Sequence, residues 1–410
     1  MDLFLRMMIF VPLLVGGPLR AETDPALLPA PVVTDPGAAY SPATRIFQGI
    51  PGLARAPGGR LWATWYSGGS DEGPENYVML SSSMDDGRTW SAATVVIDPP
   101  GPVRTYDPVL WTDPQGKLWW FYAQSYRWWD GRAGVWAVTT DNPDSPNPVW
   151  SAPRRLVDGI MMNKPTVLKN GEWLFPVAIW AEEPLKNLSV GDRKYVPPEQ
   201  LKWQAGKVGT HVYASQDQGN TFSLRGTARF PNLQFDEHML VERKDGGLWL
   251  WARTKTGIGE SFSGDDGRTW TSGKDSKIPH VNSRFFVRRL GSGRLMLVKH
   301  NPTLDVAWLA APSIYNARMK RSHLTAYLSD DDGTSWRGGL LLDERLSVSY
   351  PDGDQAPDGR IFLVYDYNRK ADKEIYLAVF TEEDILAGKL VDARSQLRIL
   401  VNKATGQATP

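Results

Sequence analysis

The stretch Ser263–Trp270 reads SGDDGRTW, and its pattern of Ser, Asp, Gly and a closing aromatic residue occurs three more times in the chain. The other copies are SMDDGRTW at Ser83–Trp90, SQDQGNTF at Ser215–Phe222 and SDDDGTSW at Ser329–Trp336. Such recurrence indicates one supersecondary unit that is built several times. Asp and Gly suit a tight turn, since Asp bonds nearby backbone N–H groups and Gly tolerates positive φ. We therefore expect each copy to close a β-hairpin rather than to carry out catalysis.

A second repeat, a Gly followed by a short apolar run, counts the units. It occurs as GRLWATW from Gly59, GKLWWFY from Gly116, GEWLFPV from Gly171, GLWLWAR from Gly247, GRLMLVK from Gly293 and GRIFLVY from Gly359. Each copy is typical of a turn that leads into a buried strand. The starting points lie 46 to 76 residues apart, near or above the size of a four-stranded blade. The sequence thus predicts an all-β fold, a six-bladed β-propeller.

Charge and cysteine content narrow the class of protein. Lys and Arg number 46, and so do Asp and Glu, which gives a net charge of zero. Charge therefore gives no reason to expect nucleic acid or an anionic membrane as a partner. The chain has no Cys, and its five His are scattered without metal-ligand spacing. We expect no metal and no cofactor, and the oligomeric state is left open.

The two ends of the chain differ from its middle. Residues 1–21 resemble a secretory signal peptide, because Arg6 precedes a mostly apolar stretch and Leu19-Arg20-Ala21 can precede cleavage. That stretch is too short to span a bilayer, so we expect a secreted or periplasmic protein. We place a linker at 22–39, the propeller at 40–395 and a tail at 396–410. Near the end, Thr381–Gly388 (TEEDILAG) is expected to form a short helix that Thr381 caps.

Charged residues at strand ends are the candidates for chemistry, because propellers bind ligands at the mouth of the central channel. Glu237 precedes the fourth apolar run and Arg253 ends it. A charge after a run of large apolar residues is costly to bury unless it is paired or faces a cavity, which favours the channel for Arg253. Arg321 precedes an expected strand and Tyr350 precedes the last apolar run. Each of these residues alone is also compatible with a structural role.

Taken together, these positions resemble the sialidase (neuraminidase) superfamily, over roughly residues 40–390. Sialidases carry a Glu before a strand that ends in an Arg, as Glu237 and Arg253 do here. They carry an Arg that opens the strand before a late Ser-x-Asp-x-Gly box, as Arg321 does, and a Tyr about one hairpin later, as Tyr350 does. The boxes alone also occur in non-catalytic propellers, so they support the fold and not the activity.

The resemblance also points to acidic residues near the first blade. The acid/base residue of sialidases lies in the loop after the first apolar run, where this chain has Asp71, Glu72 and Glu75 in GGSDEGPEN. The sequence leaves open which of the three is equivalent, and an acidic loop is usually just solvated. Asp107, in RTYDPVLW, resembles a second acidic pocket residue.

One position departs from the family pattern. Sialidases have an Arg before Ile-Pro, and here Gly49 precedes Ile50-Pro51. Arg45 is no simple substitute, because four residues of strand span about 13 Å. Arg104 and Arg284 are the candidates to reach in from other blades. Because of Gly49, we expect a changed substrate, a different ulosonic acid or a uronic acid, as an alternative to sialic acid.

The resemblance implies a retaining exo-glycosidase that acts on a terminal acidic sugar of a glycan. Tyr350 would be the nucleophile, because a phenol is not repelled by the sugar carboxylate, and Glu237 would be its base. Arg253 and Arg321 would bind the carboxylate through their planar guanidinium groups. The acid/base residue would come from the loop of Asp71, Glu72 and Glu75.

Two other functions remain open at this point. The first is a propeller enzyme of other chemistry, either a uronate lyase or another kind of glycosidase. For a lyase, His238 or His323 would be the base. The second is a propeller that binds glycans without catalysis.

Overall fold

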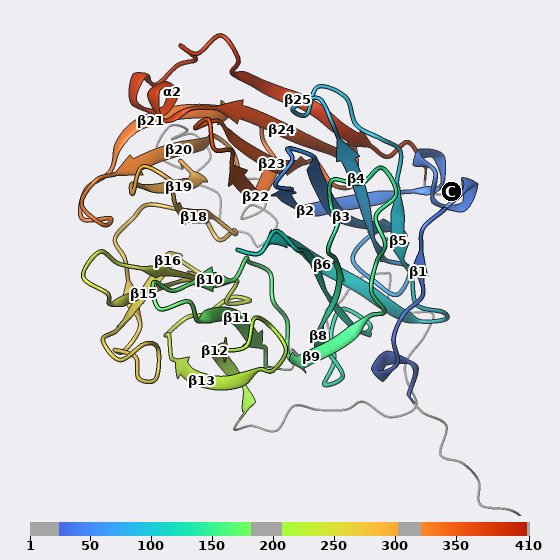
Figure 1. Cartoon of the computed structure of the whole chain (residues 1–410), viewed down its shortest axis with the longest axis horizontal. Coiled ribbons are helices and arrows are strands. Elements are labelled where there is room, and N and C mark those ends of the chain that lie inside the picture. The colour runs from blue at the N-terminus through green and yellow to red at the C-terminus, as the bar shows by residue number, and fades with distance from the viewer. Residues whose placement is uncertain (1–23, 182–206, 302–320, 408–410) are drawn as a thin grey trace, which may run out of the picture.

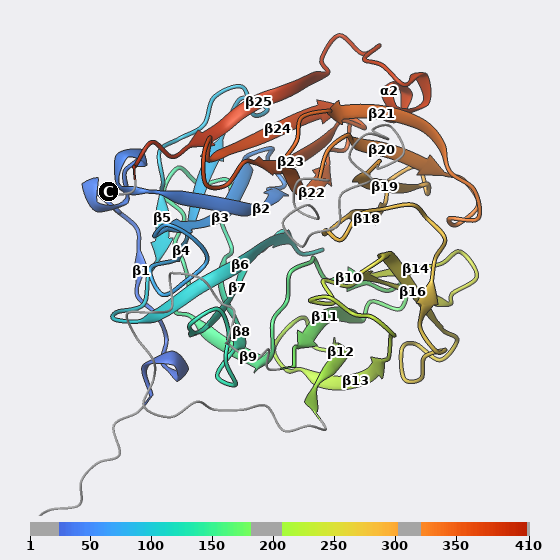
Figure 2. The same ribbon diagram turned by 180° about the vertical axis from the view of Figure 1, so that it is seen from behind.

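The computed structural model describes residues 24–181, 207–301 and 321–407. It confirms the predicted fold class. Six small antiparallel sheets stand around a central axis, each built from four consecutive strands, with one further strand added to the first sheet. Viewed down the shortest axis, the first strand of each sheet lies nearest the centre (Figures 1 and 2).

The six sheets are called blades 1 to 6, in chain order. Blade 1 consists of β2 (Phe47–Arg55), β3 (Leu61–Gly68), β4 (Tyr77–Ser83), β5 (Val95–Ile97) and the added β1 (Val32–Val33). Blade 2 consists of β6 (Val103–Thr112), β7 (Leu118–Tyr126), β8 (Gly134–Thr140) and β9 (Arg154–Asp158). Blade 3 consists of β10 (Thr166–Val167), β11 (Trp173–Ile179), β12 (Gly209–Ser215) and β13 (Ser223–Ala228).

Blades 4 to 6 complete the ring. Blade 4 consists of β14 (Met239–Glu242), β15 (Leu248–Thr254), β16 (Gly257–Ser263) and β17 (Lys274–Asp275). Blade 5 consists of β18 (Phe286–Arg289), β19 (Leu295–His300), β20 (Leu324–Ser329) and β21 (Arg337–Asp343). Blade 6 consists of β22 (Val348–Gln355), β23 (Ile361–Tyr367), β24 (Glu374–Phe380) and β25 (Gln396–Lys403).

The six apolar runs form the second strand of each blade. Every residue of β3 and of β7 is buried. The reason is that a second strand has neighbouring blades over both of its faces, so it is apolar throughout instead of alternating. These strands therefore hold the core, and their far ends reach the same rim of the channel as the beginnings of the inner strands.

The four Ser-x-Asp-x-Gly repeats connect the third and fourth strands of blades 1, 3, 4 and 5, away from that rim. In the copy from Ser263, the Ser hydroxyl donates to Asp265 and the carboxylate accepts from the backbone and the hydroxyl of Thr269, at 2.8 and 2.6 Å. These hydrogen bonds hold the pKa of Asp265 down to about 2. The other three copies have the same bonds. The carboxylate of the Asp that all four repeats share is thus used inside its own turn.

The ends of the propeller extend beyond the predicted boundaries. The tail expected from residue 396 is wrong for residues 396–403, because β25 pairs with β24 as the outer strand of blade 6. Part of the expected linker also belongs to the fold, since β1 pairs with β5. Gly406 then donates to the carbonyl of Pro42, which joins the two ends of the chain. The signal peptide lies outside the described residues.

Helix α2 (Glu382–Ala387) confirms the expected helix. Thr381 caps it through a capping box with Asp384, and Gly388 ends it in the left-handed conformation at φ 66°. Among the described residues, no helix is long and apolar enough to cross a membrane.

Candidate active site

Tyr350 and Glu237 meet at the rim of the channel although blades 4 and 6 carry them. The Tyr350 hydroxyl donates to Glu237 Oε1 at 2.6 Å. Arg253 Nη1 donates to the same Oε1 at 2.6 Å and to the Tyr350 hydroxyl at 2.9 Å. All three side chains are buried. The second oxygen of Glu237, Oε2, is buried and has no hydrogen-bond partner in the described part of the chain, so it is available as an acceptor.

Irregular backbone turns these side chains into the channel. Tyr350 has φ 57° and lies at a register shift in β22 between Ser349 and Asp352. Asp107 has φ 49° and lies at a similar shift in β6, and Glu237 has φ 43° just before β14. Such conformations cost about 1–3 kcal/mol each in residues other than Gly, and they cluster at functional sites.

Arg253 and Arg321 lie side by side. Nη2 of each donates to the carbonyl oxygen of Asn282, at 3.5 and 3.2 Å, and Nε of Arg253 donates to the Asn282 side chain at 2.7 Å. The guanidinium carbon of Arg321 lies 5.5 Å from the centre of the Tyr350 ring. Both candidate carboxylate-binding residues therefore face the candidate nucleophile.

The environment of Tyr350 keeps its phenol protonated in the free protein. Burial, followed by the negative charge of Glu237, raises the pKa of Tyr350 to about 12, although Arg253, Arg321 and Arg369 oppose the shift. The phenol must therefore lose its proton as it attacks. Glu237, which already accepts that proton in a hydrogen bond, is placed to take it.

Only one residue of the acidic loop reaches the site. Glu72 Oε2 accepts from the indole N–H of Trp128 at 2.6 Å, and its Oε1 lies 3.4 Å from Arg369 Nη1. Asp71 instead pairs with Lys370, and the side chain of Glu75 is exposed. Of the three sequence candidates, Glu72 is the one that the structure places beside the other site residues.

Asp107 is the other acidic group at the rim. Burial raises its pKa to about 8, Arg104 opposes this shift, and the charges of Glu72 and Glu237 add to it. This carboxyl group is therefore protonated at neutral pH. Arg104 stacks on Tyr106, with its guanidinium carbon 4.1 Å from the ring centre, and donates to the carbonyls of Arg127 and Trp128.

Arg284 and Arg45 are both buried and hydrogen-bonded inside the protein. The guanidinium carbon of Arg284 lies 6.0 Å from the centre of the Tyr350 ring, and its nitrogens donate to Asn163 at 2.8 Å and pair with Asp352 at 3.3 Å. Arg45 is buried and donates to Gln48 and Asn402. Neither side chain enters the space beside Gly49, which the side chain of Arg369 fills instead: a Cβ on Gly49 would lie 2.6 Å from Arg369 Cδ.

Aromatic side chains line one side of the rim. Phe235 lies 5.3–5.7 Å, between ring centres, from each of Trp128, Trp129 and Trp180. Arg253 stacks over Phe235 at 5.3 Å. The cluster excludes water from one flank of Glu237 and Arg253, which strengthens the electrostatic interactions there.

The comparisons with known proteins agree with this architecture. Residues 59–365 match the family model of the BNR repeat-like domain. The chain belongs to this family. The fold is that of the sialidase and BNR propeller superfamily. No curated protein matches the chain.

Solved structures of BNR-type propellers resemble the whole ring. A protein of unknown function from Dyadobacter fermentans DSM 18053 is 15% identical, with a TM-score of 0.57 over 82% of this chain and 94% of the other. The Hadza microbial sialidase Hz136 is 18% identical, with a TM-score of 0.59 over 83% and 67%. The intramolecular trans-sialidase from Ruminococcus gnavus is 13% identical, with a TM-score of 0.58 over 85% and 97%. At these identities the likeness shows the fold alone.

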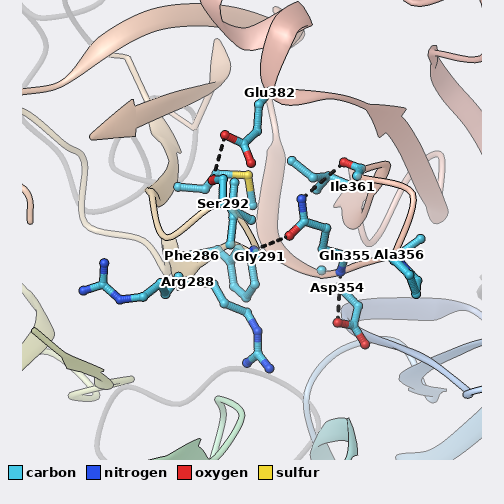
Figure 3. A pocket seen from close by; sticks show the side chains of 15 residues that line it. Phe286, Arg288, Gly291, Ser292, Asp354, Gln355, Ala356, Ile361 and Glu382 are labelled. Atoms are coloured by element: carbon cyan, nitrogen blue, oxygen red, sulfur yellow. Dashed lines mark hydrogen bonds between the residues drawn. The ribbon is translucent and has the colours of Figure 1, made fainter. Parts of the chain in front are cut away.

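A cavity at the other end of this BNR propeller is distinct from the site. It measures about 590 Å³ and lies between blades 5 and 6 (Figure 3). Its polar groups are used in local bonds: Glu382 accepts from Ser292 and Arg294, and Gln355 accepts from the backbone of Gly291. It holds no pair of a nucleophile and a base comparable to Tyr350 and Glu237.

The histidines of the lyase alternative do not join the site. His238 is buried and donates from Nε2 to the carbonyl of His211 at 2.8 Å, and burial lowers its pKa to about 3. His323 Nδ1 lies 2.9 Å from the Ser322 hydroxyl. Within the described residues, no group of three His, Asp or Glu side chains could hold a metal ion.

Arg369 is the site residue that sequence reasoning missed. It lies two residues after β23, in the connection to β24, whereas Arg253 lies within β15. The charged residue that directly follows the last apolar run is Asp366, so the rule that selected Arg253 does not select Arg369. The family motif directed attention to residues near Gly49 instead.

Proposed function

We propose that this protein is a retaining exo-glycosidase of sialidase type that removes a terminal acidic sugar. The observation that carries the proposal is the hydrogen-bonded arrangement of Tyr350, Glu237 and Arg253, in which a buried phenol donates to a buried carboxylate. A nucleophile in hydrogen-bond contact with its base is the arrangement that covalent catalysis requires.

In the first half of the reaction, Tyr350 Oη attacks the anomeric carbon and Glu237 takes the phenolic proton. The bond to the leaving oxygen breaks, and that oxygen receives a proton from a general acid. Arg253 and Arg321 bind the sugar carboxylate, and Arg253 also stabilises the developing phenolate. In the second half, water attacks the same carbon, the former acid takes its proton, and Tyr350 leaves and recovers its proton from Glu237. Two inversions give net retention.

We assign the general acid to Asp107. Burial raises the pKa of this carboxyl group to about 8, so it carries a proton at neutral pH. Glu72 is less suited to this role, because its two carboxylate oxygens already contact Arg369 Nη1 at 3.4 Å and the indole N–H of Trp128 at 2.6 Å. Glu72 would instead hold Arg369 in position.

The stereochemistry of the product tests the proposed function. Aryl and alkyl α-glycosides of sialic acid, of other ulosonic acids and of uronic acids would be incubated with the protein, and the first-formed anomer identified by proton NMR. We expect the α-anomer of the free sugar. An unsaturated product that absorbs in the ultraviolet would show a lyase. Binding without turnover of any of these glycosides would show a lectin-like protein.

Replacing Asp107 with Asn should affect substrates according to their leaving groups. Alkyl glycosides need a proton on the leaving oxygen, so kcat should fall about 100-fold, whereas nitrophenyl glycosides should lose less than 10-fold. The acid must be protonated to act, so kcat/KM of the parent enzyme should be constant below pH 8 and fall above it. The variant should lack this alkaline fall. Initial rates between pH 5 and 9.5 measure both effects.

Glu72→Gln serves as the matched variant for the acid. If Asp107 is the acid, Glu72→Gln should raise KM for both kinds of glycoside and leave the alkaline fall in place. If the leaving-group dependence and the loss of the alkaline fall followed Glu72 instead, the assignment to Asp107 would be wrong.

A further inference from the structure

We infer that Arg369 supplies, from the opposite end of the chain, the carboxylate-binding guanidinium that is absent at Gly49. The inference rests on the proposed function, since it concerns the same site. It names a specificity-determining residue for the acidic group of the sugar. The site would then hold three guanidinium groups, from Arg253, Arg321 and Arg369.

The first argument is steric. A Cβ on Gly49 would lie 2.6 Å from Arg369 Cδ, 2.7 Å from its Cγ and 2.8 Å from its Nε. These distances are shorter than any ordinary contact, so a side chain at position 49 and the observed position of Arg369 exclude each other. The backbone of Gly49 is not in the left-handed region, so its conformation does not require Gly. Gly is required at this position because Arg369 approaches it so closely.

The second argument is direction. The guanidinium carbon of Arg369 lies 4.3 Å from the centre of the Tyr350 ring, closer than that of Arg321 at 5.5 Å. Arg253 donates to the hydroxyl of the same ring. Guanidinium groups from blades 4, 5 and 6 therefore gather around one phenol. Arg284 also lies 6.0 Å from the ring centre, but Asn163 and Asp352 hold it.

The third argument is that hydrogen bonds fix the position of Arg369 while some of its N–H donors remain available for a ligand. Its Nε donates to Asp366 at 2.8 Å, Nη2 donates to Ser349 at 3.1 Å and Nη1 faces Glu72 at 3.4 Å. A guanidinium has five N–H donors. Within the described residues, these contacts leave one donor on each terminal nitrogen, which is the number that a bidentate carboxylate contact uses. The side chain retains 14% exposure.

The loop around Arg369 is tied to the strand that carries Gly49. The backbone N–H of Gln48 donates to the Arg369 carbonyl at 3.2 Å, and the N–H of Ile50 donates to Asp366 Oδ2 at 2.8 Å. Residues 48 and 50 thus bracket the glycine with bonds to the Arg369 loop. These bonds give Arg369 the fixed position that carboxylate recognition requires.

A double-mutant cycle tests the inference. Arg369→Ala should raise KM for an acidic glycoside about 10- to 100-fold with a smaller change in kcat, because a charge-assisted contact is lost. Gly49→Ala should do the same by displacing Arg369. The double variant should be no worse than Arg369→Ala, since the glycine matters only through the arginine. Gly49→Arg in the Arg369→Ala background should recover part of the affinity, because the shortened side chain leaves room for it.

Controls separate recognition of charge from damage to the fold. On the methyl ester or amide of the same sugar, Arg369→Ala should match the parent protein, because these substrates lack the charge. Lys370→Ala removes a neighbouring cation that pairs with Asp71 outside the site, and KM should not change. The thermal midpoint of each variant reports on folding.

The outcomes distinguish this inference from the proposed function. If the parent enzyme turns over acidic glycosides and Arg369→Ala keeps the parent KM, the inference is wrong and the function stands. If no glycoside is turned over, calorimetric binding of the free acidic sugar to the parent and to Arg369→Ala still tests the inference. Equal affinity, or no binding by either protein, would overturn it.

Discussion

Tyr350→Phe should lower kcat by about 10³-fold or more for every glycoside that the parent enzyme hydrolyses. The substitution removes the only atom of the side chain that can form the covalent bond, and it leaves the ring in place. Arg253 keeps its ion pair with Glu237 at 2.6 Å, so no buried charge loses its partner and the fold should survive. Steady-state rates and the thermal midpoint, measured on the same preparation, check the two halves of this expectation.

The matched control is Tyr376→Phe on β24, the third strand of blade 6. That hydroxyl donates to Glu374 and not to Glu237 or Arg253, and kcat should remain at the parent value. A Tyr350→Phe variant that kept a tenth of the parent kcat would exclude the phenol as nucleophile. The reaction would then need either direct attack by water or the elimination chemistry of a lyase, and the ultraviolet absorbance of the product would separate these two.

The fold could be predicted because its determinants are local and repeated. Each Gly-led apolar run encodes one second strand, and each Ser-x-Asp-x-Gly turn encodes one hairpin, so counting repeats was enough to count blades. The outer strand β25 was missed because only two of its eight residues, Ile399 and Val401, are buried. Such a strand has no apolar run, and its sequence QLRILVNK resembles an exposed tail.

The site could be predicted only in part, because its residues come from every side of the ring. Tyr350 lies nine residues before Gly359, and Asp107 lies nine before Gly116. Glu237 lies nine before Gly246, a glycine of positive φ in the turn before β15. This shared spacing from the turn marks three of the site residues, in blades 2, 4 and 6, and it is a signal that the sequence contained.

No such spacing marks the groups that act through loops. Arg369 and Glu72 come from connections at the rim, in blades 6 and 1, and 297 positions of sequence separate them. The repeated pattern of strands and turns does not determine the length or the direction of the connections at the rim. Arg369 occupies the volume that a side chain at position 49 would need. No sequence motif records this relation between the two residues.

The channel below the site is closed by buried charges. Lys164 Nζ donates to Asp352 Oδ2 at 2.6 Å and also to the carbonyls of Leu53 and Leu110. Burial lowers the pKa of this lysine, and the charge of Asp352 opposes that shift. Asp352 Oδ1 pairs with Arg284 at 3.3 Å. One carboxylate therefore joins the inner strands of several blades.

Asp352→Asn should accordingly lower the free energy of unfolding by about 3–5 kcal/mol, since it leaves two buried cations without their anion. Guanidinium unfolding followed by fluorescence of the many Trp residues measures the change. Asp358→Asn is the control, because Asp358 is 40% exposed and pairs with Arg360 at the surface, and it should cost less than about 1 kcal/mol.

A double variant shows how much of the lost stability comes from unpaired buried charge and how much from lost packing. In Lys164→Met/Asp352→Leu, one cation and the anion leave together, and part of the stability should return, because apolar replacements of a buried pair are often tolerated. Asp352 also accepts from the backbone N–H of Leu53 at 2.8 Å, so recovery should be incomplete. A loss of less than 1 kcal/mol in Asp352→Asn would mean that water already reaches these charges, and the lower channel would then be open to solvent rather than sealed.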